Sequence, residues 1–133
     1  MPPAMTQQET PAAAAAARQG GKVVIVMPAY NAARTIAETV RAIPEGYYDE
    51  IVVVDDHSRD DTVEQARALN LKAIRHPHNV GYGGNQKTCY MEALRDGAGV
   101  VVMLHPDGQY DPAIIPEMVR PILEERGYQV YEI

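Results

Sequence analysis

Three short runs of apolar residues without polar alternation constrain the fold of this chain most. Residues 100–104 are fully apolar and rich in valine, and comparable runs cover residues 22–27 and Glu50–Asp55. A strand whose successive residues are all apolar is buried on both faces, which is typical of the interior of a parallel sheet. Each run therefore predicts a buried parallel strand.

Segments with helical periodicity separate these strands. Ile36, Val40 and Ile43 fall on one face of a helix, for which Asn31 is the predicted N-cap. In the next connection, Ser58 followed by Asp61 predicts a capping box and a second helix. Alternating β and α units with right-handed crossovers predict an α/β fold: a Rossmann-like, mostly parallel sheet with helices on both faces.

The remaining elements follow from local signals. A short strand is predicted at Lys72–Arg75, and a helix from about Gln86 to the C-cap glycine Gly97. A helix starting at Pro116 and kinked at Pro121, then a strand over residues 128–133, complete the pattern. The first strand is expected to end before Pro28.

Composition narrows the possible partners and the cellular location. The chain has 133 residues, 12 Lys and Arg against 18 Asp and Glu, a net charge of −6 and a single cysteine, Cys89. This balance argues against nucleic-acid binding, and one cysteine excludes an internal disulfide. Residues 1–21 are predicted to be a disordered leader, and no run is apolar enough for a signal peptide or transmembrane segment. We therefore expect a cytoplasmic protein of at most one domain.

Polar residues gather where the predicted strands end. His105, Asp107, Gln109 and Asp111 follow one strand, and Asp55 and Asp56 end another. Ligands of open α/β sheets bind at this carboxyl edge, so these side chains are candidate site residues. Asp111 is equally well explained as a helix cap in front of Pro112.

A cluster of glycines, Gly81, Gly83 and Gly84, precedes the predicted helix at Gln86. Such glycines can cradle a phosphate at a helix N-terminus. The dinucleotide-binding fingerprint has a third glycine at the position where this chain has Gln86. The fingerprint also directly follows a strand, whereas in this chain a loop separates the glycines from the preceding strand. We therefore favour close backbone packing over phosphate contact. His76 and His78 lie in the preceding loop, where metal binding is not favoured.

Four motifs together resemble a known family: VVIVMPAYNAARTI, EIVVVDDHSRDDT, NVGYGGNQKT and VVMLHPDGQYDP. In this order and spacing they resemble the donor half of family 2 glycosyltransferases with the GT-A fold. The nearest subgroup is the polyprenyl-phosphate, or dolichyl-phosphate, sugar transferases. The resemblance implies that residues 22–133 form the N-terminal, donor-binding part of a longer domain.

The resemblance also implies roles for individual residues. The nucleotide-binding and donor-binding residues it implies are Pro28, Tyr30, Asp55, Asp56, Lys87, Asp107 and Gln109. Pro28 and Tyr30 would border the base, and Asp56 would accept a hydrogen bond from the base or ribose. Asp55 would be the more buried, structural acid. Gln109 would lie near the diphosphate or sugar, and Lys87 would face a phosphate.

The metal site implied by the resemblance departs from the family pattern. Asp107 matches the last acid of the D-x-D motif, but His105 stands where the family has the first acid, and Ala32 replaces another frequent acid. Cleavage of a nucleoside diphosphate sugar leaves negative charge that a divalent cation or a basic side chain must stabilise. Because imidazole binds Mn²⁺ better than Mg²⁺, His105 predicts preference for Mn²⁺ or little metal dependence.

The function expected from these features is sugar transfer, with inversion, from a UDP- or GDP-sugar to an acceptor such as a polyprenyl phosphate. Peripheral contact with the cytoplasmic face of a membrane would follow from such an acceptor. Relatives extend past the D-x-D region into the acceptor site, so the catalytic residues are unknown and this chain is expected to bind donor without transfer. An open sheet edge at the last strand also predicts self-association.

Two alternatives remain open at this stage. A non-catalytic nucleotide-sugar-binding module or an inactive fragment is favoured by His105 and by the early end of the chain. A sugar-phosphate nucleotidyltransferase would carry a glycine-rich, basic loop after its first strand, and PAYNAAR has neither property. A hydrolysis or transfer assay separates the first alternative from an active transferase.

Overall fold

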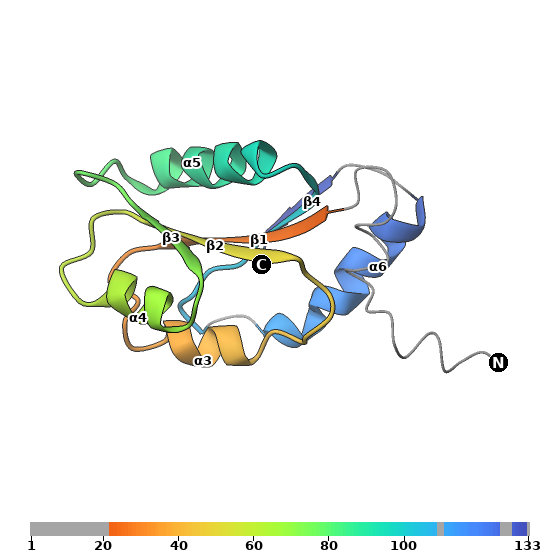
Figure 1. The fold of residues 1–133 in the computed structure, drawn as a ribbon, viewed down its shortest axis with the longest axis horizontal. Coiled ribbons are helices and arrows are strands. Elements are labelled where there is room, and N and C mark those ends of the chain that lie inside the picture. The colour runs from red at the N-terminus through yellow and green to blue at the C-terminus, as the bar shows by residue number, and fades with distance from the viewer. Residues whose placement is uncertain (1–21, 109–110, 126–128, 133) are drawn as a thin grey trace.

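A five-stranded parallel sheet forms the centre of the protein in this computed structural model, which describes residues 22–108, 111–125 and 129–132. The strands are β1 (Lys22–Ala29), β2 (Glu50–Asp55), β3 (Lys72–Arg75), β4 (Ala98–Met103) and β5 (Gln129–Glu132). They lie in the order β3-β2-β1-β4-β5, and every neighbouring pair is parallel. The predicted α/β class and parallel sheet are confirmed (Figure 1).

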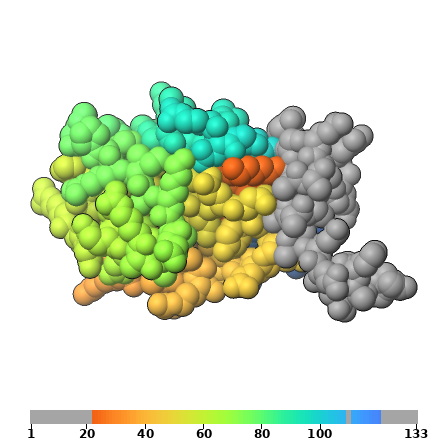
Figure 2. All heavy atoms as spheres, in the orientation of Figure 1, coloured from red at the N-terminus to blue at the C-terminus, as the bar shows by residue number. Residues whose placement is uncertain are grey.

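Helices cover both faces of the sheet, as the alternating pattern predicts. They are α3 (Ile36–Arg41), α4 (Thr62–Ala68), α5 (Tyr82–Arg95), the short 3₁₀ helix η1 (Pro112–Ile114) and α6 (Ile115–Glu125). Helix α5 lies on one side of the sheet, and α3, α4 and α6 lie on the other (Figure 1). In Figure 2, α5 in cyan and α3 in orange form opposite outer surfaces.

The core has two parts because strands β1, β2 and β4 are buried on both faces. Alternate residues of β1 point to opposite sides: Val23, Ile25 and Met27 pack toward α3 and α6, while Val24 and Val26 pack toward α5. All five side chains are fully buried. This double burial is the reason that the apolar runs lack polar alternation.

Strand β1 continues through Pro28 to Ala29, so the prediction that it ends before Pro28 is wrong. Pro28 pairs with Val54 of β2, whereas the paired register with β4 ends at Val26. The Pro28 nitrogen faces the β4 side, beyond the end of that register. No ladder hydrogen bond is lost there, so the proline is tolerated inside the sheet.

Both predicted N-caps are wrong. Helix α3 begins at Ile36 after Thr35, and the Asn31 side chain instead accepts a hydrogen bond from the Arg59 backbone N–H. Helix α4 has Asp61 as its N-cap residue without a side-chain hydrogen bond, and Ser58 pairs with Asp55 instead of capping. Longer-range contacts between the two turns take these side chains away from the helix ends.

Helix α5 begins at Tyr82, four residues before the predicted start at Gln86. Gly81 occupies the N-cap position with φ +89°, a conformation that favours glycine, and its carbonyl accepts the first helical hydrogen bond from Asn85. Gly97, with φ +82°, follows the last turn of the helix as predicted. The early start brings Tyr82 to the carboxyl edge of the sheet.

The chain after β4 follows the prediction closely. Asp111 caps η1 by accepting a hydrogen bond from the Ala113 N–H at 3.0 Å, and Pro112 is the first residue of η1. Helix α6 starts one residue before Pro116 and runs through Pro121 to Glu125. The predicted last strand is present as β5, an edge strand of the described sheet. The predicted leader, residues 1–21, and Gln109 lie outside the described residues.

The two edges of the sheet carry different polar groups. At the amino edge, the Lys72 ammonium lies 3.0 Å from a carboxylate oxygen of Asp96, and Lys22 donates to the Asp96 carbonyl. None of these three residues is among the described residues that line the two cavities at the carboxyl edge. In the part of the chain that the structure describes, no helix is long and apolar enough to cross a membrane.

Candidate functional site

A groove runs along the carboxyl edge of β1, β2 and β4. It consists of two adjoining cavities of about 230 and 390 Å³, which share Pro28, Tyr30 and Tyr82 as lining residues. We call them the Asp56 cavity and the Asp107 cavity, because each contains one of these acids. The groove thus joins two of the predicted acidic positions.

Asp55 is completely buried at the end of β2 and serves the structure of the turn. Its carboxylate accepts hydrogen bonds from the Ser58 backbone N–H, at 2.8 Å, and from the Ser58 hydroxyl. The Arg75 guanidinium lies 3.9 Å away. Asp55 does not line either cavity of the groove, so these contacts agree with a structural acid.

Asp56 lines its cavity and is bonded to the loop that precedes α5. Its Oδ1 accepts hydrogen bonds from the Val80 N–H at 2.8 Å and from His76 Nδ1 at 3.0 Å, and its Oδ2 accepts one from the Gly81 N–H at 3.0 Å. Burial works to raise the pKa of Asp56, but the Val80, His76 and Gly81 bonds together hold it below its ordinary value. The carboxylate is therefore ionised at neutral pH and acts only as an acceptor.

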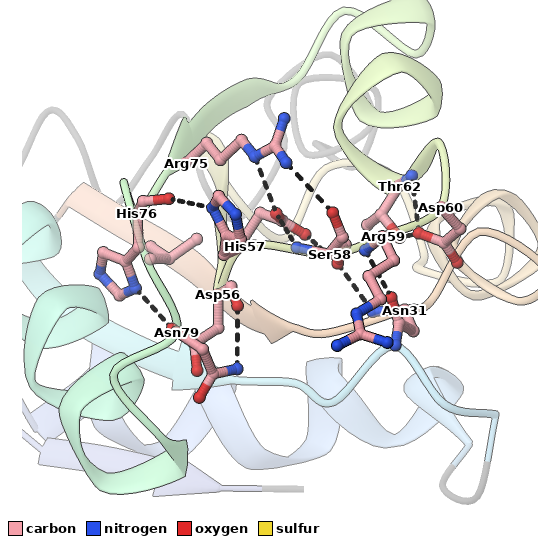
Figure 3. A network of polar contacts seen from close by, with 12 residues as sticks. Asn31, Asp56, His57, Ser58, Arg59, Asp60, Thr62, Arg75, His76 and Asn79 are labelled. Atoms are coloured by element: carbon pink, nitrogen blue, oxygen red, sulfur yellow. Dashed lines mark hydrogen bonds and ion pairs between the residues drawn. The ribbon is translucent and has the colours of Figure 1, made fainter.

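The turns after β1 and β2 are tied to each other by reciprocal hydrogen bonds (Figure 3). The Asn31 N–H donates to the Ser58 hydroxyl at 2.7 Å, and the Asn31 side-chain oxygen accepts from the Arg59 N–H at 2.8 Å. The Ala32 N–H donates to the Thr62 hydroxyl at 2.9 Å. Asn31 has φ +52° and is held there by these bonds, which fixes the wall of the groove next to Tyr30.

His105 and Asp107 line the other cavity together, at the end of β4. His105 Nε2 lies 2.7 Å from the Tyr82 hydroxyl, and the two rings stack with centroids 5.6 Å apart. Gln86 donates a hydrogen bond to the same hydroxyl at 2.9 Å. Tyr82 therefore sets the orientation of the predicted metal ligand His105.

Within the described residues, no group of three or more His, Cys, Asp or Glu side chains is arranged to hold a metal ion. The predicted pair, His105 and Asp107, provides one imidazole and one exposed carboxylate on the same cavity. This donor set suits Mn²⁺, which accepts both nitrogen and oxygen ligands. The two side chains would hold a cation whose remaining ligands come from a bound anion.

The basic side chain at this end of the groove is Arg34, which sequence reasoning missed. Arg34 lines the Asp107 cavity, whereas Lys87 is exposed on α5 and is not among the described lining residues of either cavity. Arg34 directly follows Ala33, whose backbone N–H donates to Asp60 Oδ2 at 3.1 Å. The path of the β1 turn places Arg34 at the cavity, and the sequence motifs do not predict that path.

Close packing explains one of the three glycines before and within α5. A Cβ atom on Gly84 would approach a methyl carbon of Val80 to 2.9 Å, so this position requires glycine or a shift of Val80. A Cβ on Gly83 would meet nothing within 4 Å. The favoured packing interpretation therefore holds at Gly84 and is wrong at Gly81 and Gly83, and Gly81 is explained instead by its positive φ.

His76, Asn79 and Tyr82 are further site residues that the sequence analysis did not assign. All three lie at the carboxyl edge because β3 ends at Arg75 and α5 begins at Tyr82. The order of the strands was the signal that could have found His76, since it directly follows a strand next to β2.

Burial raises the pKa of the Cys89 thiol to about 12, which keeps this thiol neutral and excludes a thiolate nucleophile there.

Comparison with known protein families identifies the family of this chain. The model for glycosyl transferase family 2 matches residues 24–131, which is most of the chain. The chain belongs to glycosyl transferase family 2. This match contains β1 from Val24 onward, β2 to β4, the turns after β1 and β2, and the loop that holds Asp56. The predicted family is confirmed.

Two curated relatives of this family 2 member are dolichyl-phosphate sugar transferases by name. The UDP-N-acetylglucosamine–dolichyl-phosphate N-acetylglucosaminyltransferase of Methanococcus voltae is 29% identical over 120 residues, covering 77% of this chain and 48% of that protein. The dolichol-phosphate mannosyltransferase of Pyrococcus furiosus is 33% identical over 108 residues, covering 76% of this chain and 30% of that protein. The resemblance to this subgroup is confirmed.

A solved structure supports the GT-A fold. Glucosyl-3-phosphoglycerate synthase from Mycobacterium tuberculosis, in complex with Mn²⁺, UDP and glucosyl-3-phosphoglycerate, superposes with a TM-score of 0.67 at 27% identity. The superposition covers 85% of this chain and 42% of that chain. The family 2 chain described here thus spans less than half the length of each of these three proteins.

Proposed function

We propose that residues 22–133 form the donor-binding part of an inverting glycosyltransferase that takes its sugar from a nucleoside diphosphate sugar. The observation that carries this proposal is the continuous groove between Asp56 and Asp107, with an apolar and aromatic middle at Pro28, Tyr30 and Tyr82. A nucleotide sugar has the same sequence of chemical groups: a flat base, a ribose and a charged diphosphate. Family membership and the UDP-bound neighbour support the same assignment.

The base and ribose belong at the Asp56 cavity in this proposal. Pro28 and Tyr30 offer an apolar edge and a half-exposed ring against which a base can pack. Asp56 is ionised and accepts hydrogen bonds from N–H or O–H groups, which bases and ribose both supply. Replacing Asp56 with Ala is expected to weaken nucleotide binding by roughly 1.5–3 kcal/mol, the range for a hydrogen bond to a charged group.

The diphosphate belongs at the Asp107 cavity. His105 and Asp107 would hold a divalent cation, which supplies positive charge against the leaving diphosphate. The Mn²⁺ bound to the mycobacterial neighbour supports this cofactor. Arg34 lines the same cavity and would contribute a second positive charge there. Gln109 near the sugar and Lys87 near a phosphate stay predictions.

The acceptor in this proposal is a polyprenyl phosphate, as the names of the two archaeal relatives suggest. A phosphate oxygen is already ionised at neutral pH, so its attack on the anomeric carbon needs little help from a general base. A lipid acceptor would bring the protein to the cytoplasmic face of a membrane. The position of β5 at the end of the described sheet supports the further proposal that copies of the chain associate.

Calorimetric titration tests the donor assignment directly. UDP, GDP and their sugars are titrated into the protein with Mn²⁺, with Mg²⁺ and with EDTA, and a parallel assay follows transfer to polyprenyl phosphate. We expect nucleotide binding that strengthens with Mn²⁺, and binding without transfer for residues 1–133. Binding to no nucleotide under any of these conditions would contradict the proposed function.

Two matched variants sharpen this titration. Arg34→Ala removes a cation that lines the Asp107 cavity, and Lys87→Ala removes one that does not. Both side chains are exposed, so neither change is expected to alter folding. A loss of affinity confined to Arg34→Ala supports the proposed diphosphate position, and a loss confined to Lys87→Ala would move that position onto α5.

A further inference from the structure

Four hydrogen bonds join the loop between β3 and α5 to one residue, Asp56. Its members Val80 and Gly81 donate backbone N–H bonds to the carboxylate, and the Asn79 side chain donates to the Asp56 carbonyl at 3.1 Å. Figure 3 shows the Asn79 amide and the His76 side chain on the same side of the β2 turn, next to Asp56. The loop therefore determines how many acceptor positions of the Asp56 carboxylate are left for a ligand.

His76 connects three elements through one imidazole ring. It follows β3, its Nδ1 bonds Asp56 Oδ1 at 3.0 Å, and its Nε2 lies 2.9 Å from the Thr88 hydroxyl of α5. The ring is largely buried, with 11% of its side chain exposed. Because a carboxylate can only accept, Nδ1 carries the proton in this bond. His76 is thus a fixed donor to Asp56.

The remaining acceptor capacity of Asp56 follows from these bonds. An ionised carboxylate offers about four lone-pair positions, two on each oxygen. His76 and Val80 occupy both positions of Oδ1, and Gly81 occupies one of Oδ2. Among the described residues nothing further donates to this carboxylate, so one acceptor position on Oδ2 is left for a ligand.

One acceptor distinguishes between nucleobases. Uracil has a single ring N–H on its pairing edge, between two carbonyl oxygens. Guanine has a ring N–H beside an exocyclic amino group, and two adjacent donors need two acceptors. A donor that is buried without a partner costs binding energy, so guanine is the poorer fit to a carboxylate with one open position.

We propose that His76 is a specificity-determining residue that makes the Asp56 cavity select uracil over guanine by occupying Oδ1 of Asp56. This inference rests on the proposed function, because it assumes that a nucleotide base enters the Asp56 cavity. His76 acts through Asp56 and does not line the cavity itself. Its removal opens a second acceptor position and releases the carboxylate to turn, which favours a base with two donors.

The test compares UDP, GDP and N3-methyl-UDP in calorimetric titrations with Mn²⁺. The wild-type protein is expected to bind UDP roughly tenfold or more tighter than GDP, as one unpaired donor predicts. N3-methyl-UDP lacks the ring N–H and should lose affinity to a similar extent. In His76→Ala, the ratio of UDP to GDP affinity is expected to fall to about threefold or less, since both bases then find acceptors.

Two further variants separate specificity from folding. His76→Gln keeps an N–H donor for Asp56 and should retain the wild-type ratio, even where His76→Ala folds poorly. His78→Ala, in the same loop at an exposed position, should leave both affinities unchanged. Protection of the Val80 and Gly81 amides from hydrogen exchange reports whether the loop still holds Asp56 in each variant.

Distinct results would overturn the inference. Equal binding of UDP and GDP by the wild-type protein, or tighter binding of GDP, refutes selection for uracil while leaving nucleotide binding intact. Equal weakening of both nucleotides in His76→Ala, with the ratio unchanged, shows a purely structural role for His76. Binding of neither nucleotide by the wild-type protein refutes this inference together with the proposed function.

Discussion

The two turns that form the groove differ in how their acids are held. In the β2 turn, residues 55–62, Asp55 and Asp56 are 0% and 3% exposed and both carboxylates accept hydrogen bonds from backbone N–H groups. In the β4 turn, residues 105–112, Asp107 is exposed beside Gly108, which has φ +78°. A buried acid in fixed contacts can discriminate between ligand groups, whereas an exposed acid can adjust to a cation and a diphosphate.

Because of this difference, loss of a buried acid and loss of the exposed acid should affect folding stability and ligand binding differently. The buried acids are required for the shape of the groove, so their loss should affect folding and ligand affinity together. The exposed acid is expected to contribute less to folding, and its loss should affect mainly ligand binding. Substitutions of Asp55, Asp56 and Asp107 test this distinction, and their effects on the free energy of unfolding should decrease in that order.

Asp55→Ala is expected to have the largest effect on stability. It leaves the buried Ser58 N–H and hydroxyl without their acceptor, which should lower the free energy of unfolding by roughly 2–4 kcal/mol. Urea denaturation followed by circular dichroism measures this loss. Asp55→Asn is the matched control and should lose less, because its side-chain oxygen still accepts. A change below about 0.5 kcal/mol in Asp55→Ala would mean that the buried acid is not structural.

Asp56→Asn should have a smaller effect that depends on pH. The pKa of Asp56 is lower in the folded protein than in the unfolded chain, so the folded state binds fewer protons. Its contribution is present above the ordinary carboxyl pKa and is lost as pH falls through the folded value. At neutral pH the variant should be less stable by roughly 1.5–3 kcal/mol.

Urea denaturation at a series of pH values between about 7 and 3 measures this dependence. The difference between wild type and Asp56→Asn should shrink as the pH falls, because the wild-type carboxylate becomes protonated. Other acids with lowered pKa values, such as Asp60, are present in both proteins and cancel in the difference. Parallel curves for the two proteins would contradict the assigned role of the Asp56 charge.

Asp107→Asn should have the smallest effect on stability. The side chain is exposed, so the free energy of unfolding should change by no more than about 0.5 kcal/mol. Nucleotide affinity in the presence of Mn²⁺ should fall, and affinity in EDTA should stay the same. A stability loss as large as that of Asp56→Asn would remove the distinction between the two turns.

The strands and the layers could be predicted from sequence because they depend on local burial. Residues 100–104 and 51–54 are apolar at every position, and only a strand covered on both faces requires this. The Asp111 cap is also local, since its partner Ala113 is two residues away. These features need no knowledge of the rest of the chain.

The contacts within the site could not be predicted in the same way because they join distant turns. Asn31 and Ser58 have the composition of helix caps, but each is bonded to the other turn across 27 or 28 residues. His76 reaches Asp56 over 20 residues, and Arg34 enters the groove only through the path of the β1 turn. The types of residue that follow the strands were enough to predict a site at the carboxyl edge. The side chains that meet at this edge depend on the order of the strands, which residue type does not indicate.

Nuclear magnetic resonance of the ¹⁵N-labelled protein with UDP tests most directly whether the carboxyl-edge groove binds the nucleotide. With Mg²⁺, the amide signals of Tyr30, Gly81 and Tyr82 should shift, and those of Lys22, Lys72 and Asp96 at the amino edge should not. Replacing Mg²⁺ with a small amount of paramagnetic Mn²⁺ should broaden the signals of His105 and Asp107 before all others. Shifts confined to the amino edge, or broadening that spares the β4 turn, would contradict the account.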